Sequence, residues 1–262
     1  MIRRINQKKA QVAIWVILGV ILVASALTFV FIETKTDILK PIEGETAFDV
    51  QTYLQECIKT DVEKTVDIIL PQGGFIKPKN YAVFNGINIS YFYDNAGYFE
   101  PGVAQNLLLS SMKNEIKNSI EDKIIECVDK MENAFERQNS RIEFADSSPP
   151  LIEVDWGPDI ISVDVIKKMT IIKQEETQNV EKTTVKIKSP AYNLAIIAFD
   201  IGTQEAATCN FEYVGYSLTY PRYQINKFQM SDSTEIYIIY DTKSKKTMNL
   251  AVRGCAISPG LP

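Results

Sequence analysis

The stretch SSPPLIEVDWGPDIISVDV, residues 147–165, divides the sequence into a helical part and a part rich in strands. Upstream of Pro149 and Pro150, apolar residues recur every three or four positions, which is the period of an amphipathic helix. Downstream, β-branched residues alternate with polar ones, which is typical of strands with one buried face. We expect at least two hairpins there, with strands at residues 151–154, 160–165, 169–173 and 183–188.

Three segments have the period of a helix. Residues 47–70 are the first, and we expect Thr46 to cap this helix and Pro71 to end it. Residues 103–137 are the second, and its apolar stripe should pack along the first helix. Residues 191–203, which follow a Ser-Pro pair, are the third. The sequence therefore predicts about three helices packed on antiparallel sheet.

The remaining strands are marked by turn residues and by aromatic or β-branched composition. Asn85-Gly86 is a strong hairpin signal in the middle of YAVFNGINISYFY. We expect strands within residues 81–93, 211–223, 235–241 and 247–257, with a polar turn at 242–246. The expected fold is an α+β domain over residues 46–262, joined by a linker at 33–45 to an N-terminal membrane helix.

That membrane helix is predicted from residues 10–32, AQVAIWVILGVILVASALTFVFI, which contain no charged residue. As a helix the segment would be about 34 Å long, enough to cross a hydrocarbon core of about 30 Å. A cleaved signal peptide is the alternative, because Ala24-Ser25-Ala26 resembles a signal peptidase site. We favour a retained anchor, since the apolar run continues for six residues beyond Ala26.

The flanks of the predicted span set its orientation. Arg3, Arg4, Lys8 and Lys9 precede it without an acidic residue, whereas the charges just after it cancel. Positive flanks stay in the cytoplasm. We therefore expect residues 1–9 to be cytoplasmic, residues 10–32 to contact the lipid bilayer, and the folded domain to be extracytoplasmic in a single-pass cell-membrane protein.

Charge argues against a nucleic-acid partner. Residues 1–40 hold six of the 28 basic and two of the 33 acidic residues, which leaves 22 basic and 31 acidic residues downstream. A net charge of −9 does not favour binding to nucleic acid or to anionic headgroups, which require clustered positive charge.

Four cysteines, Cys57, Cys127, Cys209 and Cys255, follow the predicted anchor. An even number in an oxidising compartment favours two disulfides. Cys57 and Cys127 lie in predicted helices, whereas Cys209 and Cys255 lie in or beside predicted strands, so we favour pairing helix to helix and strand to strand. Buried free thiols are the alternative.

The sequence contains no histidine. This absence excludes Ser-His-Asp and Cys-His catalysis and histidine-ligated metals, and no CxxC spacing indicates a zinc site. We expect neither a cofactor nor a metal.

The densest acidic group is Glu153, Asp155, Asp159 and Asp164, around Trp156. Paired carboxylates beside a tryptophan suggest a glycosidase or a carbohydrate-binding platform, and the acids alone suggest a cation site. The third interpretation is a solvated strand face, which we favour because exposed acids on strands are common.

Two further patterns suggest a protein-binding surface and a modification site. Tyr213, Tyr216, Tyr220 and Tyr223, with Phe211, would form a tyrosine-rich strand, and such strands occur at interfaces. Asn88-Ile89-Ser90 is an N-glycosylation triplet, usable outside the cell in a host with the machinery.

The segment Lys8-Lys9-Ala10-Gln11-Val12-Ala13-Ile14, followed by the apolar run, resembles the class III signal sequences of archaeal type IV pilin-like proteins. The resemblance implies cleavage between Ala10 and Gln11 and assembly of the apolar helix into a filament. The fifth position after that cleavage point, commonly acidic in the family, is Trp15. The stretches CIKT, QGGFI and YIIYDTKS are similar to uncharacterised membrane-anchored proteins of archaea.

These patterns lead to two functional hypotheses. The first is a non-enzymatic membrane-anchored protein of structural or interaction type, pilin-like, with protein partners or self-assembly at the cell surface. The second is an extracytoplasmic hydrolase or a cation-dependent carbohydrate-binding module that uses Glu153, Asp155 and Trp156. A concave pocket in which these side chains converge would favour the second hypothesis, and an open face would favour the first.

Overall fold

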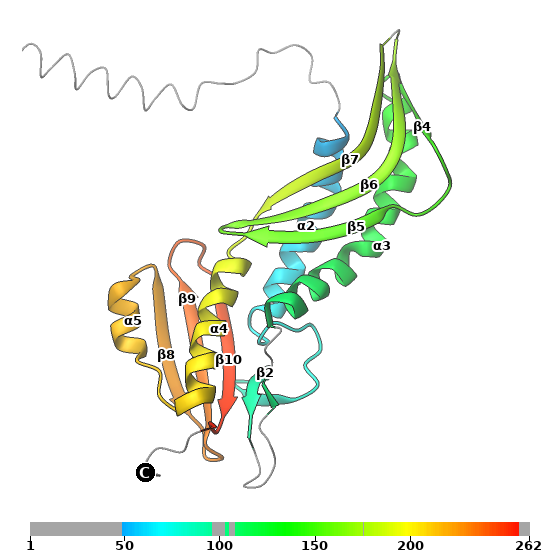
Figure 1. Ribbon diagram of the computed structural model, residues 1–262. Coiled ribbons are helices and arrows are strands. Elements are labelled where there is room, and N and C mark those ends of the chain that lie inside the picture. The colour runs from blue at the N-terminus through cyan, green and yellow to red at the C-terminus, as the bar shows by residue number, and fades with distance from the viewer. Residues whose placement is uncertain (1–48, 96–102, 105–107, 175, 257–262) are drawn as a thin grey trace, which may run out of the picture. The chain divides into compact units, whose positions relative to one another are not determined.

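The computed structural model describes residues 49–95, 103–104, 108–174 and 176–256, which belong to one compact unit with an α+β fold (Figure 1). The predicted anchor at 10–32 and the linker at 33–45 lie outside these residues. Within the described ranges, none of the helices combines the length and apolar character needed to cross a bilayer.

Two helices form an antiparallel pair, α2 (Val50–Ile69) and α3 (Leu108–Glu136). The Tyr53 hydroxyl donates a hydrogen bond of 3.0 Å to the Cys127 carbonyl, and the hydroxyls of Thr65 and Ser119 share one of 2.8 Å. Later residues of α2 thus meet earlier residues of α3. The predicted packing of the two helices is confirmed.

The starts of both helices differ from the prediction. Asp49 is the N-cap of α2, so the assignment of Thr46 is wrong. Strand β3 (Val103–Ala104) occupies the expected first turn of α3 and pairs with β2. In both cases the apolar stripe marks the face of the helix but not its first residue, since the inward residues begin at Val50 and Leu108.

The first sheet consists of β4 (Ser140–Phe144), β5 (Leu151–Gly157), β6 (Ile160–Lys173) and β7 (Glu176–Lys188). β6 is one strand, whereas two were predicted at 160–165 and 169–173. A register shift between Ile166 and Met169 separates its halves, which pair with β5 and β4 respectively. The bulge turns Lys167 inward, where its ammonium donates to the Asp146 carbonyl at 2.8 Å and also contacts the Ser148 carbonyl. Lys167 thus holds the β4–β5 loop in place.

The second sheet has the order β1-β2-β10-β9-β8. Its strands are β1 (Tyr81–Phe84), β2 (Ile87–Asp94), β8 (Tyr223–Gln229), β9 (Thr234–Asp241) and β10 (Thr247–Arg253). Asn85 and Gly86 have positive φ angles of 50° and 79° in the β1–β2 turn, as the hairpin signal predicts. All neighbours are antiparallel except β2 and β10, which are parallel.

Two further helices accompany the second sheet. α4 (Ala191–Thr208) lies over β9 and β10 (Figure 1), and it approaches β2 closely at Gly202, where a Cβ would lie 2.4 Å from the Phe92 ring. α5 (Tyr213–Thr219) lies where residues 211–223 were predicted to be a strand, so that prediction is wrong. Aromatic composition favoured a strand, but Tyr213, Tyr216 and Tyr220 are also spaced at three and four, which is a helical period.

The main core connects the helices with both sheets. It includes Leu54, Ile120 and Phe135 from the helix pair, Val163 from β6, and Tyr237 from β9. A smaller cluster under the β1–β2 hairpin comprises Ala82, Ile89, Tyr91, Ile236 and Ala251.

Both disulfides are present, and the predicted pairing is confirmed. Cys57–Cys127 links α2 to α3, and Cys209–Cys255 links the end of α4 to the segment after β10. Cys209 was expected in or beside a strand, but it is the C-cap of helix α4, with a φ angle of 52°.

Candidate functional site

The predicted acidic group is divided by the fold. Glu153 on β5 lies opposite Asp164 on β6. The Asp155 carboxylate contacts the Lys113 ammonium at 3.3 Å, and the Asp164 carboxylate contacts the Lys182 ammonium at 2.8 Å. These three acids line a groove of about 460 Å³ beside α3. A backbone hydrogen bond at Trp156 and the contact with Lys113 lower the pKa of Asp155, so this carboxylate remains charged and paired with a cation.

Trp156 and Asp159 point elsewhere. Trp156 packs against the main core, with its ring edge to face on Tyr192 at a centroid distance of 5.9 Å. Glu153 and Asp155 are exposed, as strand alternation requires. The acids and the tryptophan therefore do not form one sugar-binding platform. Among the described residues, no three His, Cys, Asp or Glu side chains are arranged to hold a metal ion.

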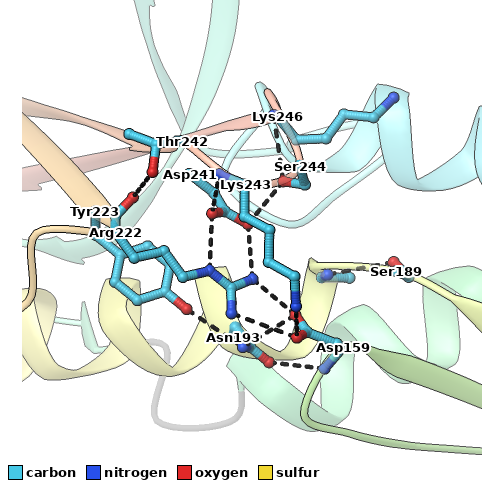
Figure 2. A network of polar contacts seen from close by, with 11 residues as sticks. Asp159, Ser189, Asn193, Arg222, Tyr223, Asp241, Thr242, Lys243, Ser244 and Lys246 are labelled. Carbon is cyan, nitrogen blue, oxygen red and sulfur yellow. Dashed lines mark hydrogen bonds and ion pairs between the residues drawn. The ribbon is translucent and has the colours of Figure 1, made fainter. Parts of the chain in front are cut away.

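Asp159 instead belongs to a polar network around Arg222, shown in Figure 2. Asp159 comes from the β5–β6 turn, Arg222 precedes β8, Asp241 ends β9, Lys243 lies in the β9–β10 turn, and Asn193 lies in the first turn of α4. We call these five residues the Arg222 network. It brings the first sheet, the second sheet and α4 together.

The guanidinium of Arg222 binds two carboxylates at once (Figure 2). Its Nε and Nη2 donate to the two oxygens of Asp241 at 2.8 and 2.9 Å, and Nη2 also donates to Asp159 Oδ1 at 2.7 Å. Such bidentate pairs are among the strong hydrogen bonds of proteins. Hydrogen bonds to Asp241 and Asp159 raise the pKa of Arg222.

The β5–β6 turn fixes the position of Asp159, which has a φ angle of 59°. Its amide donates to Asn193 Oδ1 at 3.0 Å, and Asn193 Nδ2 donates to the Tyr223 hydroxyl at 3.2 Å. Lys243 Nζ donates to Asp159 Oδ2 at 2.6 Å. Hydrogen bonds from Arg222 and Lys243 lower the pKa of Asp159. This carboxylate is therefore oriented from both sheets and from α4.

The β9–β10 turn is built on the side chain of Asp241, which is fully buried. Asp241 Oδ1 accepts from the Lys243 amide at 3.0 Å, and Oδ2 accepts from the Ser244 hydroxyl at 2.7 Å. An aspartate that accepts from the amide two residues on is a common turn-forming arrangement. The turn sequence DTKS thus fixes the position of the Asp241 carboxylate to which Arg222 binds.

Two grooves flank Ser189 and Pro190 beside the network. One has a volume of about 420 Å³, and includes Pro158, Ile160, Arg222 and Lys243 in its lining. The other has a volume of about 370 Å³ and lies between α2 and the β9–β10 turn. The Ser189 hydroxyl accepts a hydrogen bond of 3.2 Å from the Ala191 amide at the start of α4.

The chemistry of the network is that of a structural link. Arg222 donates to both Asp159 and Asp241. These contacts keep the two carboxylates ionised, which does not suit proton transfer. We infer that the network fixes the two sheets relative to α4.

Acid should weaken this link. Burial tends to raise the pKa of Asp241, but hydrogen bonds from Arg222 and Ser244 outweigh it and lower the pKa from 3.8 to about 2. A lowered pKa stabilises the fold fully above the unfolded value and loses that effect as pH falls towards the folded value. We expect a loss on the order of 2 kcal/mol between pH 4 and pH 2. Urea unfolding at several pH values checks this, and Asp241→Asn should show a shallower decline; equal slopes would contradict the assignment.

A second buried cluster was not predicted. Glu205 on α4 is 1% exposed, and its Oε1 accepts from the Phe211 amide at 2.9 Å, from Lys227 Nζ at 3.1 Å and from the Tyr237 hydroxyl. Lys227 also contacts Glu235 at 2.8 Å. Burial raises the pKa of Glu235 and of Tyr237. This cluster joins α4 to β8 and β9.

The tyrosines that were predicted to form a strand surface lie on and beside helix α5. Tyr213, Tyr216 and Tyr223 are partly buried and pack against the core, so they offer only part of their surface to a partner. The residues exposed beside them are Val214, Leu218 and Tyr220, at 52%, 80% and 52%. The apolar surface on and beside α5 therefore consists mainly of other residues than those predicted.

The residues that sequence reasoning missed carried weak signals. The DTKS turn was noted as polar and as part of the YIIYDTKS stretch, but not as a partner of Arg222, and neither Arg222 nor Glu205 lies in a motif. Comparisons of this chain with family models, with curated proteins and with solved structures give no match.

Proposed function

We propose that this chain is a membrane-anchored extracytoplasmic protein of structural or interaction type, with a pilin-like N-terminus. The two disulfides carry the proposal, because such bonds persist in oxidising compartments and are rare in reducing ones. The basic residues before the apolar segment at 10–32 support the same orientation.

A structural role is supported by charged side chains that link different elements of the fold. Arg222 and Lys227 each bridge two carboxylates. Exposed apolar side chains on and beside α5, with Leu218 at 80%, offer contact area to a partner. The separation of Trp156 from Glu153 and Asp155 gives no reason to add a carbohydrate-processing function.

Pilin-like processing is the finer part of the proposal. The sequence around Ala10 and Gln11 supports cleavage between them, which would leave the apolar helix at the new N-terminus. Such a helix can remain in the bilayer or pack with copies of itself.

Mass spectrometry of the N-terminus of protein from native membranes tests this proposal. We expect a mature chain that starts at Gln11. A chain that still starts at Met1 would keep the anchor and contradict pilin-like processing, whereas a start after Ala26 would contradict the anchor itself. Protease treatment of intact cells should degrade the folded domain, and degradation only after lysis would contradict the orientation.

A further inference from the structure

We propose that Asn88 is an N-glycosylation site, and that its glycan is attached before the β1–β2 hairpin docks. The proposal rests on the extracytoplasmic placement proposed above. Asn88-Ile89-Ser90 is the only Asn-X-Ser/Thr triplet in the sequence, and a glycan on this triplet belongs on an exposed asparagine of an exported chain.

The position of Asn88 in the fold suits a glycan. Asn88 lies on β2, two residues after Gly86 of the hairpin turn, and its side chain is exposed. Its carboxamide makes no hydrogen bond with any described residue, so attachment would break no contact. The directly opposite residue on β1 is Val83, which is 54% exposed. A glycan on Asn88 would therefore cover apolar surface that the fold leaves open.

A groove lies beside the attachment point. It has a volume of about 340 Å³, and Asn88 is part of its wall together with Ile68, Pro71, Gln72, Asp67, Gly86 and Ile87. Ile68 is 44% exposed. Apolar side chains can pack against the C–H faces of a sugar while Gln72 and Asp67 bond its hydroxyls. The groove beside Asn88 thus offers the first sugar of the glycan both apolar and polar contacts.

The chemistry requires one co-substrate, a lipid-linked glycosyl phosphate or diphosphate. The carboxamide nitrogen of Asn88 attacks the anomeric carbon of the donor, a C–N bond forms, and the C–O bond to the phosphate breaks. The phosphate leaves with the bonding electron pair, and the amide proton passes to a base of the transferase. The step involves no oxidation or reduction.

Ser90 determines when this transfer happens. The transferase must reach the whole triplet, yet Ser90 is 2% exposed, and its amide donates to the Gln72 carbonyl at 3.1 Å. The segment after α2 packs closely on Ser90, since a Cβ at Gly73 would lie 2.9 Å from the Ser90 carbonyl oxygen. In the folded domain the third residue of the triplet is covered. Glycosylation therefore precedes docking of the hairpin.

Glycopeptide mass spectrometry of the full chain, isolated from native membranes, tests the site. We expect the peptide that contains Asn88 to carry a glycan, and Asn88→Gln and Ser90→Ala to abolish it. Asn226→Gln, a change at an exposed strand asparagine outside any triplet, should leave the glycan in place. Asn88→Gln changes an exposed residue, so its result holds even where Ser90→Ala disturbs folding.

The outcomes separate the two proposals. An unmodified Asn88 in a chain that surface protease digests on intact cells would overturn the glycosylation site and leave the placement intact. A chain protected inside the cell would overturn both. For timing, reduced and unfolded chain should accept glycan from host membranes and donor, whereas the folded, disulfide-bonded chain should not; equal transfer to both would overturn the order of events.

Discussion

Replacement of Arg222 by methionine is expected to lower the free energy of unfolding by about 3 kcal/mol. The change leaves Asp241, which is fully buried, without its cation. An unpaired buried charge costs far more than the original pair contributes, because its loss of hydration is no longer offset by an ion pair. Urea unfolding of the full chain in detergent, followed by circular dichroism, measures the loss.

Lys243→Met is the matched control. Lys243 binds Asp159 from the same network, but its side chain is 65% exposed, so its removal should cost less than about 1 kcal/mol. Asp241→Asn combined with Arg222→Met should recover part of the loss, because the buried charge is then gone. Equal effects of Arg222→Met and Lys243→Met would contradict the structural role of Arg222.

Removal of the Cys57–Cys127 disulfide by a double change to alanine is expected to cost about 4 kcal/mol. The bond closes a loop with a sequence separation of 70 residues, and the cross-link restricts the unfolded chain. It also ties α2 to α3, whose inward faces are part of the main core. Chemical unfolding of the double variant and of the parent measures the difference.

Reduction and the second disulfide provide the controls. The Cys209→Ala, Cys255→Ala variant should lose a similar amount, because its loop is only somewhat shorter, with a separation of 46 residues. The parent chain with both bonds reduced should be less stable than either double variant. A Cys57→Ala, Cys127→Ala variant as stable as the parent would mean that the bond does not restrain the unfolded chain as the loop model requires.

The elements that were predicted from the sequence are those fixed by local chemistry. Asn85-Gly86 determines the β1–β2 turn, and the stripe from Leu108 to Phe135 determines the inward face of α3. The disulfide pairing followed from the contexts of the four cysteines. The turn and the inward face are specified by neighbouring residues alone, whereas the disulfides join residues 70 and 46 positions apart, and only the contexts of the cysteines were local.

The elements that were not predicted depend on distant contacts. Residues 213–219 have a composition that suits a strand, but they form a helix in which the Ser217 hydroxyl accepts a hydrogen bond from the Ile225 amide on β8. Asp159 and Arg222 are 63 positions apart, and no local pattern joins them. Trp156 and the acids are close in sequence, yet strand alternation turns Trp156 away from Glu153 and Asp155, and the β5–β6 turn places Asp159 in the Arg222 network.

The parallel pairing of β2 with β10 has a consequence for the order of folding. Ala251 lies opposite Tyr91, and β10 is inserted between β2 and β9. The sheet therefore stays incomplete until a strand about 160 residues downstream of β2 has been made. Contacts so distant in sequence slow folding, because a long loop must close before they form. We expect the second sheet to stay open in the nascent chain until β10 has been made, and in that state β2, with the Asn88 triplet, still lacks its β10 partner.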